Sequence, residues 1–142
     1  IYTRMRNLPA SRIDVADLHE SLVADGCVVG RNSRIERCIL GVRSRVGAGV
    51  TLRDTVLIGS DDFETDAERA ANRKIGRPDL NIGDGAEIAN AILDKDCRIG
   101  RGVKLTNAKN LQEADGPNGS YHIRDGIICV PRSAVIPDGT VV

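Results

Sequence analysis

The segment RIERCILGVRSRVGAGVTL, residues 34–52, recurs as EIANAILDKDCRIGRGVKL at residues 87–105. The two copies align without a gap at an offset of 53 residues (87 minus 34), and both carry the same ILxxxxRxGxGVxL pattern. They also share an irregularity, because Ile35 to Val46 and Ile88 to Ile99 are each eleven residues apart. Two unrelated segments rarely acquire the same irregularity by chance. We therefore interpret them as successive parts of one repeating structure.

Around these copies, aliphatic residues recur every six positions, a spacing that fits neither a helix nor simple alternation. A six-residue repeat is typical of a parallel β-helix with a triangular cross-section, in which three hexads complete one coil. Glycines are expected to permit turns with positive φ, both after inward residues (Gly47, Gly100) and within the pairs Gly47/Gly49, Gly83/Gly85 and Gly100/Gly102. A β-sandwich is the alternative, although its turns usually fall about every 8–12 residues. The expected inward residues are Val23, Val29, Ile35, Val46, Leu52, Ile58, Ile82, Ile88, Ile99, Leu105, Ile136 and Val142.

Two segments interrupt the repeat. Residues 60–81 contain Thr65-Asp-Ala-Glu68, a capping box followed by helix formers to about Lys74, which predicts a short helix or a projecting loop. Residues 107–125 contain Asp-Gly-Pro-Asn-Gly, which predicts a turn. Residues 1–12 lack the hexad and are interpreted as an interdomain linker, so the β-helix domain is predicted over residues 13–142.

The composition of the 142 residues argues against several classes of function. Twenty basic residues balance twenty acidic ones, which argues against nucleic acid as a partner, although nine arginines lie within residues 1–53. No apolar run approaches the ~20 residues of a membrane span, so no membrane association is expected. The four cysteines lack metal-ligand spacing, and we expect them to be mostly small core residues in a cytoplasmic protein. Neither a catalytic site nor a metal site is predicted in this chain.

Several segments together resemble one enzyme family. They are TRMRNLPASRI, GVRSRVGAGV, GSDDFETDAE, AILDKDCRIG, NLQEADG and DGIICVPRSAVIPDGTVV, which run from the start of the chain to its end. The sequence is similar to the C-terminal part of glucose-1-phosphate adenylyltransferases (ADP-glucose pyrophosphorylases), of the plant and cyanobacterial type. The resemblance implies an all-β fold, a single-stranded left-handed parallel β-helix of hexapeptide repeats with a short helical excursion.

The resemblance also implies a role. These enzymes make ADP-glucose and pyrophosphate from ATP and glucose 1-phosphate for glycogen and starch synthesis. Their N-terminal domain carries the catalytic residues and Mg²⁺. This chain, which has no phosphate-binding glycine loop, is expected to be inactive alone and to bind no cofactor. It is expected to partner its own catalytic domain, to assemble as a homotetramer and to bind an anionic phosphate-bearing effector.

Four residues match the family's effector-binding positions. Lys95 lies in the DKDCRIG segment, and Arg132 replaces a lysine of the family near the C-terminus. Arg6 matches a linker arginine, and Arg4 stands two residues before it. The resemblance thus predicts an allosteric anion site formed by Lys95, Arg132, Arg6 and Arg4. Arginine retains the positive charge and can grip phosphate bidentately, but the replacement at Arg132 leaves the preferred effector open.

Other readings of the same repeat remain open. A hexapeptide-repeat acyltransferase would use a histidine as general base, and His122 in the second interruption is the candidate. Another sugar-phosphate nucleotidyltransferase, or a β-helix with a purely structural role, would also fit the repeat. The ETDAE and QEAD segments favour the adenylyltransferase.

Overall fold

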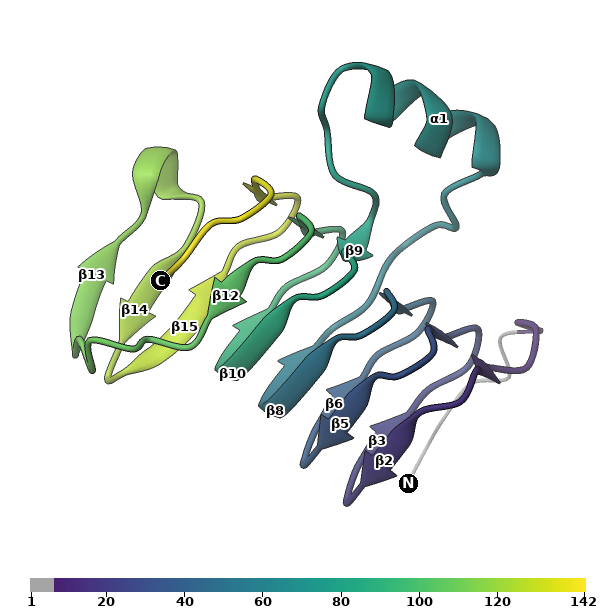
Figure 1. The fold of residues 1–142 in the computed structure, drawn as a ribbon, viewed down its shortest axis with the longest axis horizontal. Helices are drawn as coiled ribbons and strands as arrows, with labels where there is room; N and C mark the ends of the chain where they lie inside the picture. The colour runs from purple at the N-terminus through teal and green to yellow at the C-terminus, as the bar shows by residue number, and fades with distance from the viewer. Residues whose placement is uncertain (1–6) are drawn as a thin grey trace.

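A computed structural model describes residues 7–142, in which short strands wind into a stack of triangular coils (Figure 1). Because successive coils pair strand on strand, most strand pairs are parallel. The strands are β1 (Arg12–Ile13), β2 (Asp17–His19), β3 (Leu22–Val23), β4 (Val28–Val29), β5 (Arg34–Glu36), β6 (Ile39–Leu40), β7 (Arg45–Val46), β8 (Thr51–Leu57), β9 (Asn81–Ile82), β10 (Glu87–Leu93), β11 (Arg98–Ile99), β12 (Lys104–Leu105), β13 (Glu113–Asp115), β14 (His122–Arg124), β15 (Ile127–Val130) and β16 (Val135–Ile136).

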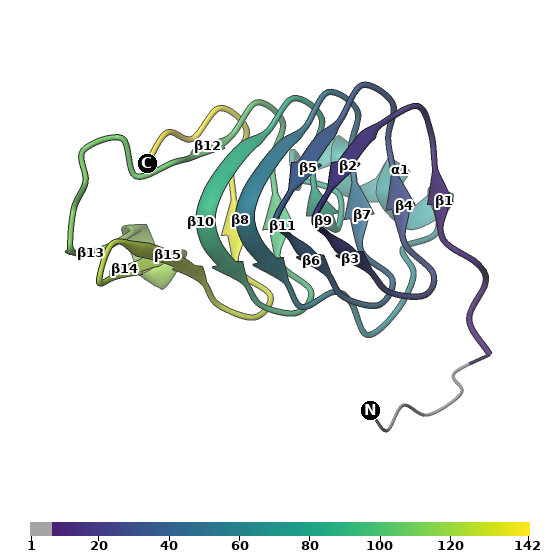
Figure 2. The ribbon, with the colours of Figure 1, turned by 90° about the horizontal axis from the view of Figure 1, so that it is seen from below.

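The coils have three faces, which Figure 2 shows from below the stack. The first face consists of β1, β4, β7, β9, β11 and β16. The second contains β2, β5 and β12 with the first halves of β8 and β10, and the third contains β3, β6 and β15 with the second halves of those two long strands. This parallel arrangement excludes the β-sandwich and confirms a parallel β-helix.

The core is three columns of aliphatic side chains, one for each face. In the second column Ile35 pairs with Leu52, Leu52 with Ile88, and Ile88 with Leu105, and all four are fully buried. A column of this kind stabilises neighbouring coils mutually, since each coil covers the apolar surface of the next. Nine of the twelve predicted inward residues are buried, and Val23 and Val142 pack against the core from near the ends of the stack.

Two details of the predicted coil were wrong. The coil holds 17 residues, the separation of the partners Ile35 and Leu52, because its second side is one residue short of a hexad. For the same reason Leu57 is the buried residue, whereas Ile58 is 40% exposed. Gly49, Gly85 and Gly102 adopt the predicted positive φ, whereas Gly47, Gly83 and Gly100 do not. The latter three are needed because a Cβ on Gly47, for example, would lie 2.7 Å from the backbone nitrogen of Asp84 in the next coil.

The first interruption forms the predicted helix α1 (Asp66–Lys74), which projects from the stack in Figure 1. Thr65 and Glu68 form both halves of the capping box, as the sequence predicts. Where the chain re-enters the coil, the Asn81 side-chain oxygen accepts a hydrogen bond from the Arg45 backbone nitrogen (2.9 Å). The side-chain nitrogen Nδ2 of Asn81 in turn donates a hydrogen bond to the buried Ser60 hydroxyl oxygen at 2.9 Å. A side chain therefore completes the backbone ladder that the excursion interrupts.

The second interruption adds antiparallel strands at one end of the stack. β13 pairs with β14 and β14 with β15, and the 3₁₀ turn η1 (Pro117–Gly119) lies at the predicted Asp-Gly-Pro-Asn-Gly sequence. The turn is confirmed, but the strand pairing was not predicted. Within residues 7–142 the longest helix is the highly charged α1, and no helix is both long and apolar enough to cross a membrane.

Candidate functional site: a cationic corner and an arginine groove

Lys95 and Arg132 lie at the same corner of successive coils. Strand β10 pairs with β15 in a register that aligns Leu93 with Val130, so residues two positions later also correspond. The backbone nitrogen of Ser133 donates to the Lys95 carbonyl oxygen at 3.0 Å, which holds the two turns together. The coil geometry therefore brings together two cations that are 37 positions apart in the sequence (132 minus 95).

The carboxylate of Asp61 lies between these two cations. Lys95 Nζ is 2.6 Å from Asp61 Oδ1, and the Arg132 guanidinium donates to the other oxygen, Oδ2. The Arg132 guanidinium also contacts Asp96 Oδ2 at 3.3 Å. The hydrogen bond from Lys95 and the charges of both cations hold the pKa of Asp61 below its ordinary value. We call these four residues the Lys95 corner; its two positive charges face two negative ones.

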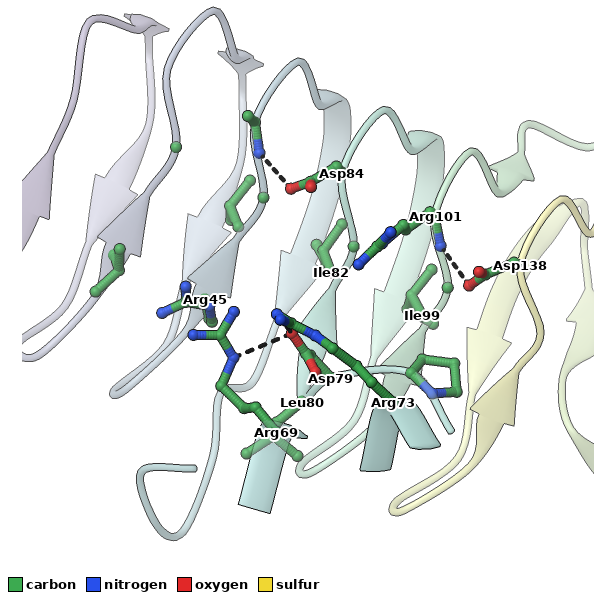
Figure 3. Close-up of a pocket in the computed structure, with 18 of the residues that line it drawn as sticks. Arg45, Arg69, Arg73, Asp79, Leu80, Ile82, Asp84, Ile99, Arg101 and Asp138 are labelled. Atoms are coloured by element: carbon green, nitrogen blue, oxygen red, sulfur yellow. Dashed lines mark hydrogen bonds and ion pairs between the residues drawn. The ribbon is translucent and has the colours of Figure 1, made fainter. Parts of the chain in front are cut away.

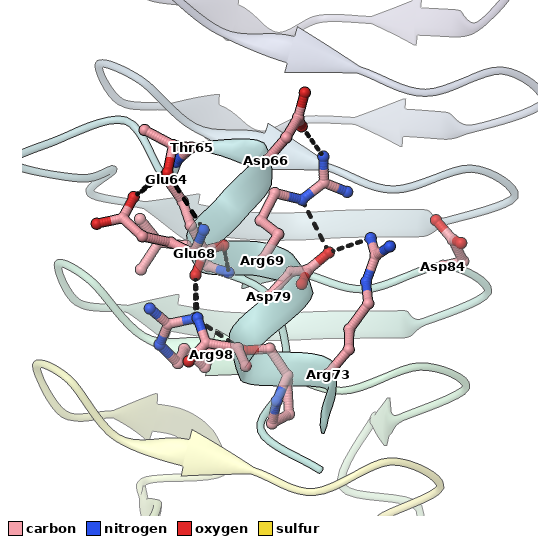
Figure 4. Close-up of polar contacts among 12 residues, drawn as sticks. Glu64, Thr65, Asp66, Glu68, Arg69, Arg73, Asp79, Asp84 and Arg98 are labelled. Atoms are coloured by element: carbon pink, nitrogen blue, oxygen red, sulfur yellow. Dashed lines mark hydrogen bonds and ion pairs between the residues drawn. The ribbon is translucent and has the colours of Figure 1, made fainter. Parts of the chain in front are cut away.

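Helix α1 is fixed to the coils by Glu64. One Glu64 oxygen accepts hydrogen bonds from Arg98 (2.7 Å) and from Asn72 (2.6 Å), and the other accepts from the Leu80 backbone nitrogen (2.8 Å), as Figure 4 shows in part. The Arg98 guanidinium also donates to the Pro78 carbonyl oxygen at 2.8 Å. The side chains of Glu64 and Arg98 are only 5% and 12% exposed. The pair thus closes the base of the excursion in a largely dry site.

A groove of about 540 Å³ separates α1 from the first face of the coils. Seven arginines and four aspartates line it, which leaves an excess of three positive charges (seven minus four). Figure 3 shows Arg45, Arg69, Arg73 and Arg101 directing their side chains into this space. None of the four residues of the Lys95 corner lines it. We call it the arginine groove; its charged residues are Arg12, Arg31, Arg45, Arg69, Arg73, Arg77, Arg101, Asp14, Asp79, Asp84 and Asp138.

Asp79 lies in the groove between two arginines of α1. Its Oδ2 is 3.0 Å from Arg69 and 2.8 Å from Arg73, while Oδ1 is buried without a hydrogen-bond partner. Burial favours the neutral acid, but the hydrogen bonds from Arg73 and Arg69 prevail and hold the pKa of Asp79 below its ordinary value. Asp79 therefore neutralises charge on α1 and forms no bond to the arginines of the coils.

Arg45 is the cation with the least compensation in the groove. Its side chain makes no ion pair or hydrogen bond with any of residues 7–142 that the structure describes, although the residue is partly buried. Burial and then the charge of Arg69 lower its pKa. Arg45 and Arg98 occupy equivalent positions in the two repeat copies, which predicts a structural role for both. That interpretation fits Arg98, whereas Arg45 forms no such bond.

Other predicted residues stand apart from these clusters. Arg4 and Arg6 lie outside the described residues. His122 Nδ1 is 2.6 Å from Asp115 on the antiparallel strands, a pair that the sequence did not reveal. The hydrogen bonds from His122 and from Arg124 lower the pKa of Asp115. Over residues 7–142 no three His, Cys, Asp or Glu side chains cluster as metal ligands would, and the prediction of a metal-free chain stays a prediction.

Sequence reasoning missed the two carboxylates that organise the site. Asp61 and Glu64 both lie in the DDFETDAE segment, which was singled out for its capping box and for its resemblance to a family, and neither observation assigned these two residues a role. The available signal was their position, since they follow directly after the last regular coil before the excursion. Residues at such a junction leave the corner and can fold back over it. Their partners could not be read from the repeat, because it is interrupted there.

A comparison with protein families matches almost the whole chain. The sequence model described as "GLGC left-handed parallel beta-helix domain" covers residues 6–141. The chain belongs to this family. The GLGC domain is part of nucleotidyltransferase-family enzymes, and the match identifies the chain with the C-terminal domain of glucose-1-phosphate adenylyltransferases. The resemblance to the C-terminal part of glucose-1-phosphate adenylyltransferases is thereby confirmed, as is the left-handed β-helix that it implied.

Proposed function

We propose that this GLGC domain is the regulatory and subunit-assembly domain of a glucose-1-phosphate adenylyltransferase of the plant and cyanobacterial type. The observation that supports it most is the meeting of Lys95 and Arg132 at Asp61. Two cations at hydrogen-bond distance from one carboxylate are also spaced to hold one phosphate group. The catalytic residues, with their Mg²⁺, would belong to another domain of the enzyme, and this chain alone would form no ADP-glucose.

In this proposal the effector competes with Asp61. An incoming phosphate would take over the hydrogen bonds that Lys95 and Arg132 now donate to Asp61. Because the charges within the Lys95 corner balance, a net attraction for an anion needs further cations. Arg4, Arg6 and residues of the catalytic domain would supply them, as the family resemblance implies. We therefore expect weak effector binding at this corner in the isolated chain, and stronger binding in the complete cytoplasmic enzyme.

The outer surface of the third face suits the assembly role. The strand register aligns Leu22 with Ile39, Ile39 with Val56, Val56 with Ile92, and Ile92 with Cys129. Leu22, Ile39 and Ile92 are 68%, 46% and 41% exposed, so an apolar stripe follows the stack. Apolar stripes of this kind mark surfaces that another protein surface covers. We propose that the catalytic domain or another subunit of the homotetramer covers it.

The proposal is tested on the full-length enzyme. ADP-glucose formation is measured while 3-phosphoglycerate, fructose 1,6-bisphosphate or inorganic phosphate is titrated. Lys95→Ala and Arg132→Ala should each raise the half-saturating effector concentration about tenfold, with the activity without effector unchanged. Arg53→Ala is the matched control, because Arg53 is exposed and forms no ion pair with any described residue. Unchanged effector curves in both variants would remove the Lys95 corner from the regulatory site.

A second candidate function rests on the pair of His122 and Asp115. A histidine held by a carboxylate is the arrangement of a general base, as a hexapeptide-repeat acyltransferase would require. In the chain, however, Arg124 shares the same Asp115 oxygen at 2.7 Å, and the three form an exposed ion-pair network on a hairpin. Acetyl-CoA turnover that disappears in His122→Ala would favour this function over the regulatory one.

A further inference from the structure

The arginine groove is built by two separate parts of the fold. Arg45 and Arg101 extend from the coils, and Arg69 and Arg73 extend from α1 on the opposite wall (Figure 3). Basic side chains therefore reach the same space from two sides, whereas a solvated basic face would carry them on one side only. Convergence of several cations on one cavity is the arrangement that recognises a phosphoryl group.

The four aspartates of the groove are already engaged. Asp79 bridges Arg69 and Arg73. Asp84 accepts a hydrogen bond from the Ala48 backbone nitrogen (2.9 Å), Asp138 accepts one from the Arg101 backbone nitrogen (2.8 Å), and Asp14 lies 3.7 Å from Arg12. Among the described residues, four groove arginines consequently have no ion-pair partner: Arg31, Arg45, Arg77 and Arg101.

Arg45 is the most informative of these four. A guanidinium that loses water without gaining a counter-ion destabilises the folded protein, and Arg69 adds repulsion. A neutral side chain at this position would avoid both costs. The exposed arginines among residues 7–142 carry no comparable penalty, because water solvates them. An anion that enters the groove would supply the missing partner for Arg45 and reduce the repulsion from Arg69.

The floor of the groove leaves room for such an anion. Glycines form part of its lining, namely Gly30, Gly47, Gly76, Gly83 and Gly100, and none of them carries a side chain that could fill the space. The volume of about 540 Å³ lies within the range of about 300–1,000 Å³ that small-molecule sites occupy.

We propose that the arginine groove binds the phosphoryl group of a small phosphorylated ligand, at a site separate from the Lys95 corner. Arg45 and Arg101 donate to the phosphoryl oxygens from the coils, and Arg73 contributes positive charge from α1. The site consists of residues of this chain, so it needs no second domain to bind. The excess of three positive charges favours ligands with more than one phosphoryl group, and pyrophosphate is the smallest of them.

Isothermal titration calorimetry of the 142-residue chain with pyrophosphate tests the proposal. We expect one saturable site on the wild type, and at least a tenfold loss of affinity in Arg45→Gln and in Arg101→Gln, because each removes a charge-assisted contact. Arg53→Gln and Lys95→Gln are the controls and should change the affinity less than twofold. A circular dichroism melt of each variant verifies that it is folded.

Two results would overturn the proposal. One is a wild type that shows no saturable binding of pyrophosphate, including the case in which the chain binds an acidic peptide instead. The other is a loss of binding in Lys95→Gln together with full binding in Arg45→Gln, which would place the ligand at the Lys95 corner. Because the proposed function is judged by effector activation of the full-length enzyme, either idea can fail while the other stands.

Discussion

The two repeat copies, residues 34–52 and 87–105, have the same core and different electrostatics. The first strand of each copy begins at an equivalent residue, Arg34 in β5 and Glu87 in β10, and the inward Ile35 and Ile88 are both fully buried. Arg45 and Arg98 occupy the same position in the two copies, one residue before an inward Val46 or Ile99. Arg98 is paired with Glu64, whereas Arg45 has no ion pair among the described residues.

The excursion between the copies causes this difference. It contributes a carboxylate, Glu64, to the second copy and a cation, Arg69, to the first. The coil thus supplies equivalent positions, and the inserted segment determines what each one can do. A repeat protein can in this way turn one structural position into two chemical environments without altering its core.

Among the substitutions that test this comparison, Arg98→Gln is expected to have the largest effect. This variant leaves the Glu64 carboxylate buried without its counter-ion, which should lower the free energy of unfolding by about 3 kcal/mol. Arg45→Gln, the matched change in the other copy, loses no ion pair and removes a partly buried charge, so it should raise the free energy of unfolding slightly, by less than about 0.5 kcal/mol. Urea unfolding followed by circular dichroism measures both. Equal losses in the two variants would contradict the assignment of different environments.

A smaller effect should follow from loosening α1. Thr65→Ala removes the capping box and should cost about 1 kcal/mol of helix stability. Hydrogen exchange should rise in residues 66–74 while the coils stay protected. Pyrophosphate affinity should fall, since Arg69 and Arg73 would no longer be held over the groove. Binding at wild-type strength with a frayed helix would show that α1 contributes nothing to the groove.

The Lys95 corner offers a comparison with the groove, since one substitution should remove the negative charge that its two cations share. In Asp61→Asn neither Lys95 nor Arg132 faces the Asp61 charge any longer, and effector affinity of the full-length enzyme should rise about fivefold. Asp61→Glu, which keeps the charge, is the control. A rise in affinity in Asp61→Glu as large as that in Asp61→Asn would show that the Asp61 charge does not compete with the effector.

Asp61 should also have a small effect on the stability of the protein at acid pH. Its folded pKa is lowered, so its ion pairs stabilise the protein above the unfolded pKa of about 3.9, and that contribution is lost as the pH falls through the folded pKa. The melting temperature of the wild type should therefore fall more steeply below about pH 4 than that of Asp61→Asn. Parallel curves for the two proteins would contradict the lowered pKa.

The cores of the two copies, by contrast, should respond alike. Burial raises the pKa of Cys38 in the first copy, and it raises the pKa of Cys97 in the second to about 12. Both thiols should resist a thiol reagent at pH 8 until the protein unfolds, because the thiolate is the reactive form. Cys129, outside both copies and only partly buried, should react first. Rapid labelling of Cys97 in folded protein would show that the second core is open.

The sequence predicted the fold well because each repeat position carries its own signal. An aliphatic residue at every sixth position and the shared glycines indicate the coil, and the Thr65–Glu68 pair indicates the helix. The 17-residue coil was missed because Leu57 and Ile58 are adjacent aliphatic residues, and only coil stacking determines which one points inward.

The site was harder to predict. Lys95 and Arg132 were chosen by resemblance, and their proximity follows from equivalent corners only once the coil register is known. Asp61 and Glu64 reach their partners through an irregular segment, where no periodicity predicts direction. The groove depends on where α1 lies over the coils, which a capping box does not specify.

The difference between Arg45 and Arg98 is tested most directly by NMR. The arginine Nε–Hε signals of the 142-residue chain would be followed while pyrophosphate is added, with signals assigned by substitution. We expect the Arg45 and Arg101 signals to shift together and saturate, while those of Arg98 and Arg132 stay in place. Saturable shifts at Arg132 with no change at Arg45 would contradict this expectation.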